Sequence, residues 1–209
     1  MNTTETKEMV LEICNATIAA KEELCRLDGH VGDGDHGFTV ERGFTAVKKM
    51  IESEDEAETP AEVFEAVGDE LADTMGGAIG LIIGGLFTGG AEEMGDADEL
   101  DAEGLYALLS GGLEEIKAIG GAKEGDRTLI DALSPACDAY KEALDAGSDM
   151  GTCIAKAADA AKAGAEATAN MVAKKGRAKF LQEGSKGFVD AGSVTMSIII
   201  KAMSDYINK

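Results

Sequence analysis

Three carboxylates are crowded into one short segment of the chain. The ten residues from Asp28 to Gly37 (DGHVGDGDHG) include Asp28, Asp33 and Asp35, together with two histidines and four glycines. Because glycine lets a loop turn freely, the three aspartates need not diverge as neighbours on a helix would. Carboxylates held together repel one another, and a hard divalent cation relieves that repulsion by taking oxygen ligands. The segment therefore predicts a metal site, with a solvated acidic loop as the alternative.

Magnesium suits this segment better than calcium bound in an EF-hand. Counting twelve positions from Asp28 or Asp33 ends at Thr39 or Phe44, where an EF-hand loop needs a bidentate glutamate. Magnesium accepts a few carboxylates and completes its coordination with water and phosphate oxygens. We therefore expect Mg2+ at the aspartates of this segment.

The acidic segment leads into an amphipathic helix, whose apolar stripe consists of Val40, Phe44, Val47 and Ile51. Gly34 and Gly37 flank Asp35 and His36, so the backbone can come close to a ligand. The helix that follows offers unpaired N–H groups to an anion. A metal beside a helix N-terminus predicts a phosphate site. His36 is either a hydrogen-bonded structural residue or a catalyst, and both interpretations remain open.

Two further segments have a composition that suits ligand binding. DTMGGAIG (73–80) is glycine-rich but does not fit the dinucleotide fingerprint GxGxxG, and no strand precedes it. It predicts either close helix packing through small residues or a loop around a nucleotide. KKGRAK (174–179) is the densest basic patch, and it is either a solvated face or a phosphate-neutralising segment. Arg177 suits the second role because its planar fork can hold oxygens in two places.

Helical patterns account for most of the chain. Thr59, Pro60 and Glu62 form the signature of a capping box at the start of a helix through Leu71. Asp101 is a suitable cap for the next helix, and GGAKEGD ends that helix before the helical period resumes at Ile130. Further helices are expected near the N-terminus, at 76–90, at 152–173 and at 193–207. With the helix at 40–51 the count is about eight, and no alternation typical of strands occurs.

Composition excludes several classes of function. The chain carries 40 acidic and 19 basic residues, a net charge of −21, so a nucleic-acid backbone would be repelled. The four cysteines are widely spaced without a CxxC, which favours reduced core thiols in a cytoplasmic protein. The most apolar segment, Gly76 to Gly90, is shorter than the ~20 residues that span a bilayer, and no secretory signal opens the chain. We expect neither a nucleic-acid nor a membrane partner.

These segments, in this order, resemble the L subunit of bacterial dihydroxyacetone kinase, the nucleotide-binding half of that enzyme. The resemblance is carried by LDGHVGDGDHGFTVERGF, MGGAIG, GAKEGDRT and KKGRAKFLQEGSKGFVDAG. They reach from near the N-terminus to the last helix. The resemblance implies an all-α fold in which residues 1–209 form a single domain, a barrel of about eight antiparallel helices. A nucleotide, ADP or ATP, would bind at one end of the barrel with two Mg2+ ions.

The resemblance also implies roles for individual residues. It makes Asp28, Asp33 and Asp35 the metal ligands, and Arg177 and His36 the catalytic residues. The nucleotide would be bound by His36, Gly37, Phe38, Thr39, Asp73, Thr74, Gly120, Leu129, Arg177, Asp190, Ala191 and Gly192. Three positions depart from the family pattern. Thr39 stands where the family often has asparagine, and Ile79 where it often has serine. Ala191 belongs to a DAG sequence where the family has a DPG-type turn. Each departure is expected to loosen contact with the nucleotide or to mark a branch with a different donor or substrate.

The implied activity is phosphoryl transfer to dihydroxyacetone held on a separate K subunit. The donor would be ATP, or a phosphoprotein of the sugar phosphotransferase system acting through bound ADP. Two alternatives stay open, a kinase for a longer ketose such as erythrulose and a nucleotide-loaded regulatory module without turnover. The sequence also leaves the oligomeric state open, a homodimer included.

Overall fold

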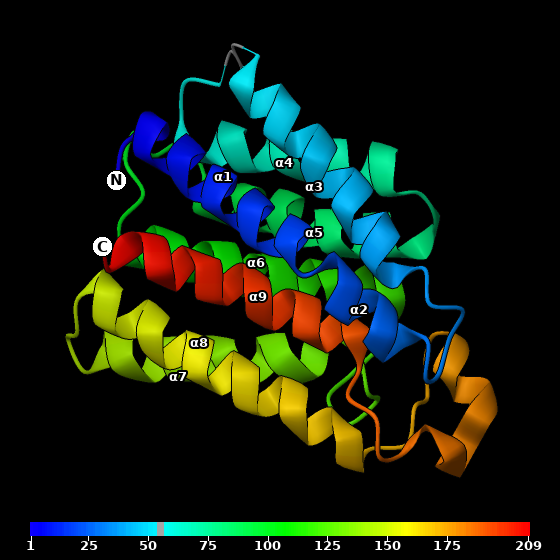
Figure 1. The fold of residues 1–209 in the computed structure, drawn as a ribbon. Coiled ribbons are helices and arrows are strands. Elements are labelled where there is room, and N and C mark those ends of the chain that lie inside the picture. The colour runs from blue at the N-terminus through cyan, green and yellow to red at the C-terminus, as the bar shows by residue number, and fades with distance from the viewer. Residues whose placement is uncertain (54–56) are drawn as a thin grey trace.

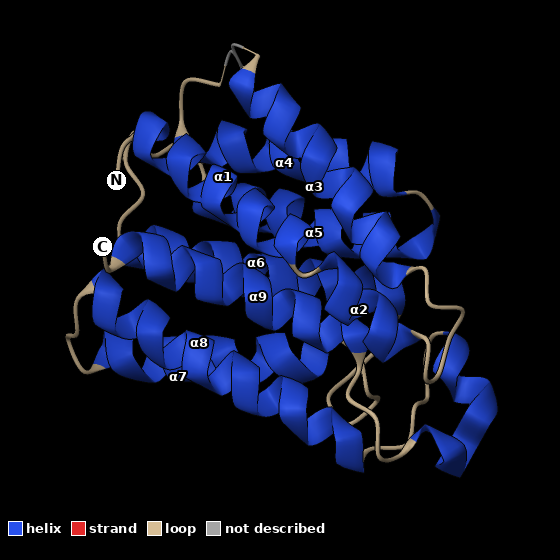
Figure 2. Ribbon diagram, viewed as in Figure 1, coloured by secondary structure: helices blue, strands red, loops and turns tan. Residues whose placement is uncertain are grey.

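Helices make up all the regular structure in the described part of the chain. The computed structural model describes residues 1–53 and 57–209, and within these ranges it has nine α-helices, two 3-10 helices and no strand (Figure 2). The all-α expectation is therefore confirmed. The elements are α1 (Thr3–Ala19), α2 (Lys21–Asp28), α3 (His36–Glu52), α4 (Pro60–Met75), α5 (Gly77–Met94), α6 (Ala102–Gly120), α7 (Ile130–Asp145), α8 (Met150–Ala167), η1 (Thr168–Asn170), η2 (Arg177–Ser185) and α9 (Ala191–Ile207).

Eight of the helices close into a barrel. The ring runs from α1 through α3, α4, α5, α6, α7, α8 and α9, and α9 packs back against α1 (Figure 1). Neighbours in the ring run in opposite directions, and one continuous core of buried apolar side chains fills the space between them. The short α2 is the additional helix, because the expected N-terminal helix is interrupted at Ala20 and continues as a separate segment against α3 and α9.

The local signals for helix starts behave as expected. Thr59 accepts a hydrogen bond from the Glu62 N–H, and the Glu62 side chain returns one to the Thr59 N–H, which completes the capping box of α4. Asp101 caps α6 by accepting from the Gly104 N–H. Some boundaries differ from the prediction: α4 continues to Met75, the α-helical part of the alanine-rich run ends at Ala167, and α9 begins at Ala191.

Glycines let neighbouring helices approach closely. A Cβ on Gly68 of α4 would lie 2.7 Å from the Gly84 carbonyl oxygen, and a Cβ on Gly84 of α5 would lie 2.6 Å from the Gly68 carbonyl oxygen. Contacts this short would force the two backbones apart. The apolar segment around Gly84 is thus buried within the barrel wall, as expected. None of the described helices has the length and apolar character needed to cross a membrane.

The alternation of helix direction gathers four connections at one end of the barrel. The turns from α2 to α3, α4 to α5, α6 to α7 and α8 to α9 all lie at the end opposite the two chain termini (Figure 1). The acidic segment belongs to the first of these connections and the basic segment to the last. The fold therefore brings together the segments that the sequence selects.

Candidate functional site

The three aspartates of the acidic loop (residues 28–35) converge. Asp28 is the last residue of α2, and its carboxylate accepts hydrogen bonds from the N–H groups of Gly34 (2.9 Å) and Asp35 (3.2 Å). Carboxylate oxygens of Asp28, Asp33 and Asp35 lie within 4.8 Å of one another, with Asp28 half-buried and the other two exposed. Three hard oxygen donors this close form a ligand set suited to Mg2+.

Arg177 reaches this cluster from the far end of the sequence. It is the first residue of η2, and its guanidinium forms an ion pair with the carboxylate of Asp33. Both side chains are partly exposed, Arg177 by 68% and Asp33 by 40%. The fold thus joins two residues that the sequence proposed for different tasks, and the guanidinium supplies positive charge where carboxylates would otherwise repel.

The N-terminus of α3 follows the acidic loop directly. Asp35 is its N-cap residue but makes no side-chain capping hydrogen bond, and the first intrahelical bond runs from the Thr39 N–H to the Asp35 carbonyl (3.1 Å). The Asp35 carboxylate therefore leaves the N–H groups of His36, Gly37 and Phe38 for another acceptor. An anion placed here would lie beside the acidic loop, and the arrangement suits a phosphate bridged to a cation.

His36 is held in one orientation. Its Nε2 lies 2.8 Å from the Thr195 hydroxyl oxygen, and that hydroxyl can also donate to the Ala191 carbonyl. The tautomer of the ring decides which of the two groups donates in the contact between His36 and Thr195. Burial lowers the pKa of His36, although the Asp28 charge and a hydrogen bond with the Ala191 backbone act against it. His36 thus joins α3 to α9 as an uncharged ring.

The basic segment packs against the α6–α7 connection. Lys175 Nζ donates to the Gly120 carbonyl (3.3 Å), and Lys174 Nζ donates to the Gly125 carbonyl (3.0 Å) and pairs with the Asp126 carboxylate (3.2 Å). Two of the lysines therefore fasten one loop to another, while Arg177 faces the acidic loop. Gly120 is consequently placed at the same end of the barrel as the metal-ligand set.

The turn before α9 meets the start of α7. Leu129 is buried, and a Cβ on Gly192 would lie 3.9 Å from the Leu129 Cβ. Asp190 caps α9 through the Ser193 N–H (2.8 Å). Burial raises the pKa of Asp190 to about 6, although the Ser193 N–H and the positive charge of Arg127 favour the carboxylate form. These expected nucleotide-binding residues are thus neighbours in space.

Asp73 and Thr74 lie in the last turn of α4. The Thr74 hydroxyl donates to the Glu70 carbonyl (2.6 Å), so its own helix already uses it. Arg42 of α3 donates to the carbonyls of Thr74 (2.9 Å) and Met75, which holds the α4–α5 turn beside α3. The structure therefore places these residues near the site end, but with the Thr74 side chain engaged elsewhere.

Other groups at this end were missed by sequence reasoning. The N-terminus of α5 begins after Gly76, which provides no side-chain cap, so its first N–H groups are a second candidate for anion contact. The glycine pair before the apolar run was a signal for it. Ile79, one of the departures, lies in this turn and packs partly against the core. Thr195 and Arg127 had no local signal, because their partners are distant in sequence.

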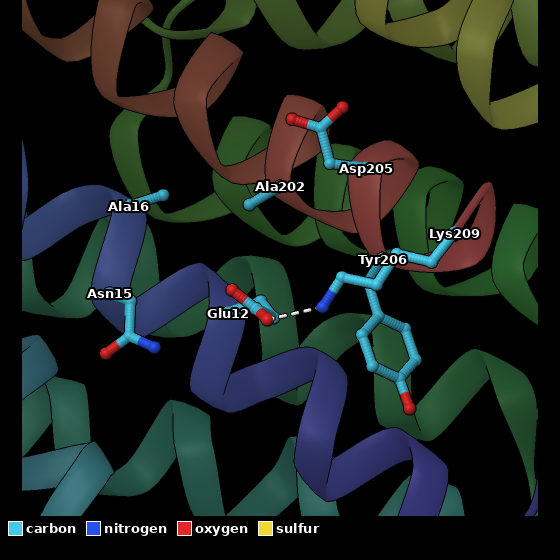
Figure 3. A pocket seen from close by; sticks show the side chains of 7 residues that line it. All are labelled: Glu12, Asn15, Ala16, Ala202, Asp205, Tyr206 and Lys209. Carbon is cyan, nitrogen blue, oxygen red and sulfur yellow. Dashed lines mark hydrogen bonds and ion pairs between the residues drawn. The ribbon is translucent and has the colours of Figure 1, made fainter.

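A hollow elsewhere on the molecule lies between α1 and α9 (Figure 3). The ion pair from Lys209 to Glu12 crosses it, and Asp205 and Tyr206 also line it. Its volume of about 310 Å3 is at the lower limit for ligand pockets. Tyr206 and Asp190 are at opposite ends of α9, roughly 24 Å apart along the helix axis. The hollow is therefore separate from the acidic loop.

Comparison with known proteins identifies a common family. The family model described as the DAK2 domain matches residues 30–205. The ADP-binding subunit DhaL of a PEP-dependent dihydroxyacetone kinase from Listeria innocua is 32% identical over 183 residues, which cover 88% of this chain and 86% of the relative. L-erythrulose 1-kinase from Mycolicibacterium smegmatis is 32% identical over 202 residues, covering 96% of this chain. The chain spans about a third, 35%, of the length of that kinase.

A solved structure has the same fold. The dihydroxyacetone kinase of C. freundii in complex with AMP-PNP and Mg2+ superimposes with a TM-score of 0.73 at 28% sequence identity. The match covers 98% of this chain and 34% of that protein. The similarity therefore extends over the whole barrel and corresponds to one part of a larger kinase.

Proposed function

The chain belongs to the DAK2 domain family and is of the DhaL type, and on this premise we propose that it is the nucleotide-binding subunit of a dihydroxyacetone kinase. In this proposal residues 1–209 form one domain that binds ADP or ATP with Mg2+. A phosphoryl group passes from the nucleotide to a hydroxyl of dihydroxyacetone held by a separate K subunit. We also propose a cytoplasmic location, because reduced thiols such as the four free cysteines are typical of that compartment.

One observation carries the proposal. The three converging carboxylates lie directly beside the uncapped N-terminus of α3. Carboxylates attract a divalent cation, whereas helix N–H groups attract an anion, so the two features together suit a ligand that contains both. A magnesium–nucleotide complex has this composition. The names of the Listeria and C. freundii relatives, which mention ADP and AMP-PNP with Mg2+, support the same choice.

The carboxylate oxygens of Asp28, Asp33 and Asp35 are donors that fit magnesium. In the proposal these three residues would hold two Mg2+ ions. Bound magnesium would offset phosphate charge during transfer. The N–H groups of the first α3 turn, from His36 to Thr39, would bind phosphate oxygens. Arg177 would then exchange its contact with Asp33 for phosphate oxygens.

The remaining nucleotide contacts follow the connections at the same barrel end. Gly120 and Leu129 would border the base, and Asp190, Ala191 and Gly192 would form the closing segment. Asp73 and Thr74 would contribute mainly through the position of the α4–α5 turn, since the Thr74 hydroxyl bonds to Glu70. His36, proposed with Arg177 as a catalytic residue, would also orient the first turn of α3 through its contact with Thr195.

The surface around the site suits a protein partner. The exposed large apolar side chains among the described residues are Phe38, Leu81, Ile119, Phe180 and Leu181. They belong to the first turn of α3, the first two turns of α5, the last turn of α6, and η2. All of these positions are at the site end of the barrel. We name this set the apolar rim and assign it to docking of the K subunit, because transfer to a substrate held by a partner requires a contact that excludes water.

The relatives support a second candidate for the acceptor. L-erythrulose 1-kinase from M. smegmatis shares the domain, so the ketose could be erythrulose, which would be held by the same missing half. A regulatory module without turnover is the alternative of another class. The donor is ATP or a phosphoprotein of the phosphotransferase system, and the second donor would require an additional protein partner. A homodimer remains a further proposal for the assembly.

The first experiment is calorimetry of ADP binding with and without Mg2+. Because phosphate oxygens complete the coordination, we expect affinity to rise strongly when magnesium is present, and metal alone to bind weakly. Equal ADP affinity in the two conditions would refute the proposed site.

The second experiment measures phosphorylation of dihydroxyacetone, and then erythrulose, by this chain mixed with a K subunit. Each donor is tested separately. Arg177→Lys keeps the positive charge but loses the two-pronged geometry, so turnover should fall by roughly 10²-fold while nucleotide affinity changes less. Absence of product with every donor and ketose would remove the kinase proposal. A variant that loses only affinity would refute the role of Arg177 in transfer.

A further inference from the structure

Arg127 is a fully buried cation next to the site but outside its proposed ligand set. Its side chain is 0% exposed, and Nη2 donates to the Phe188 carbonyl at 2.8 Å. Nη1 lies 3.7 Å from the Asp190 carboxylate, close enough for an ion pair but too far for a hydrogen bond. Nε and Nη1 have no hydrogen-bond partner among the described residues. A buried charge with unfilled donors is costly, so its presence requires an explanation.

The first partner of Arg127 leads to the acidic loop. The aromatic ring of Phe188 stacks on the His30 ring, with centroids 4.7 Å apart and an angle of 18° between the planes. His30 lies between Asp28 and Asp33 in the acidic loop. The guanidinium therefore holds the backbone of the residue whose ring supports the middle of that loop.

The second partner leads to the other end of the same loop. Asp190 caps α9, whose Thr195 hydroxyl oxygen meets His36 Nε2 at 2.8 Å. His36 follows Asp35 directly. Arg127 thus adjoins two paths of contact, one that ends at His30 and one that ends at His36.

The surrounding loop is built to keep Arg127 in place. The Asp131 carboxylate accepts from the N–H groups of Gly125 (2.5 Å) and Thr128 (2.7 Å), which folds the α6–α7 connection around Arg127. The backbone of Arg127 has a φ of 61°, a conformation that glycine adopts more readily. The position therefore retains a large charged side chain where backbone conformation alone would favour glycine.

We infer that Arg127 is a positioning residue that sets the geometry of the acidic loop, and hence the affinity for magnesium–nucleotide, without contacting the ligand. It acts by holding Phe188 and Asp190, which in turn hold His30 and His36. This inference rests on the proposed function. Outer partners of metal ligands commonly change metal affinity by about 10- to 100-fold, although they touch no metal themselves.

The two histidines provide a readout that does not need ligand. His30 and His36 are the only histidines in the chain, so their ring protons give two resolvable NMR signals that report both paths. The ring current of Phe188 acts on His30 only while the rings stay stacked. Arg127→Met removes the charge and the donors but keeps an unbranched side chain of similar length. We expect it to shift both histidine signals in the ligand-free protein and to weaken Mg–ADP binding by about tenfold or more.

Two further variants separate positioning from loss of stability. Tyr140→Phe, on α7 and thus on the helix that follows Arg127, removes the hydrogen bond from the Tyr140 hydroxyl to the Ala102 carbonyl (2.9 Å), away from the acidic loop. It should lower the melting temperature yet leave both histidine signals and Mg–ADP affinity unchanged. Arg127→Lys keeps a buried cation and is the variant to use if Arg127→Met does not fold. Arg127→Lys should weaken Mg–ADP binding less than Arg127→Met does, because lysine still supplies a cation to one of the two partners, Phe188 or Asp190.

The outcomes distinguish this inference from the proposed function. If the wild type binds Mg–ADP and the Arg127 variants bind equally well with unshifted histidine signals, Arg127 has no positioning role. If the wild type does not bind Mg–ADP, the proposed function fails, and the histidine signals alone then decide whether Arg127 orders the acidic loop. Equal effects of Arg127→Met and Tyr140→Phe would also refute the inference.

Discussion

Replacing Gly37 with alanine tests whether the position of the first α3 turn determines ligand binding. A Cβ at Gly37 would lie 2.1 Å from the Lys21 carbonyl oxygen, 2.7 Å from Cys25 Sγ and 3.0 Å from the Cys25 backbone nitrogen. Two of these three atoms belong to the backbone of α2, so a change of side-chain rotamer cannot remove the conflict. The start of α3 must move away from α2 instead.

The size of the effect follows from these distances. Ordinary contacts between heavy atoms are about 3.5 Å or longer, so the first turn must move by roughly 1 Å or more. Overpacking of this kind costs about 1–3 kcal/mol, and the better helix propensity of alanine offsets about 1 kcal/mol. The stability loss is therefore small, a few degrees in melting temperature for a chain of this length. The displacement is large compared with the ~0.2 Å tolerance of metal–ligand distances, so Mg–ADP affinity should fall at least roughly tenfold.

The assay combines calorimetric titration with Mg–ADP and thermal unfolding of the same samples. Gly104→Ala is the matched control, since Gly104 also lies in the first turn of a helix, and its Cβ would approach only side-chain atoms, of Leu100 (3.3 Å) and Asp101 (3.4 Å). The control should keep the wild-type affinity. The reasoning is refuted if Gly37→Ala folds and binds Mg–ADP as tightly as Gly104→Ala does.

Three other predictions follow. Arg177 and a metal ion compete for the Asp33 carboxylate, so Arg177→Gln should strengthen Mn2+ binding measured without nucleotide. The gain should reach at most about fivefold, the value expected for an exposed ion pair. Unchanged or weaker Mn2+ binding would contradict this competition. Burial raises the pKa of Asp190 from 3.8 to about 6, so the folded state holds this proton more tightly than the unfolded chain. The wild type should therefore lose up to about 3 kcal/mol of unfolding free energy from this group as pH rises from about 4 to about 6, with no further change above that. Urea unfolding at several pH values should show no such loss from this position in Asp190→Asn, and parallel pH curves for the two proteins would disprove it. Phe180 is 79% exposed in the apolar rim, so Phe180→Ser should weaken binding of the K subunit in an interaction assay without changing Mg–ADP affinity. Unchanged binding of the K subunit would exclude Phe180 from the docking surface.

Short-range patterns predicted most helices and the centre of the site. The capping box at Thr59 and the cap at Asp101 act over three residues, so the signals are complete within the segment itself. The acidic loop is similar, because the Asp28 carboxylate binds N–H groups only six and seven residues away. Chain-local hydrogen bonds therefore fold the loop back on Asp28, whereas the Asp33 carboxylate is paired with Arg177 from a distant segment.

The length of the N-terminal helical region was less well predicted. Its apolar period gave no sign of the interruption at Ala20, where α1 ends and α2 begins. The α2 helix packs against α3 and α9, and this tertiary packing favours a change of direction that helix propensity alone would not produce. The boundary of the alanine-rich run at Ala167 is a comparable case, since alanine favours helix on both sides of it.

Contacts between distant segments were decided by closure of the barrel. The sequence selected Asp33 and Arg177 separately, but only the return of η2 to the site end makes them an ion pair. His36 meets Thr195 across 159 positions, and Arg127 meets Phe188 across 61. Such pairs leave no periodic or local trace, because their geometry depends on the packing of all eight helices around one core. The sequence by itself therefore determined the helices and the acidic loop, whereas the tertiary structure decided which side chains support that loop.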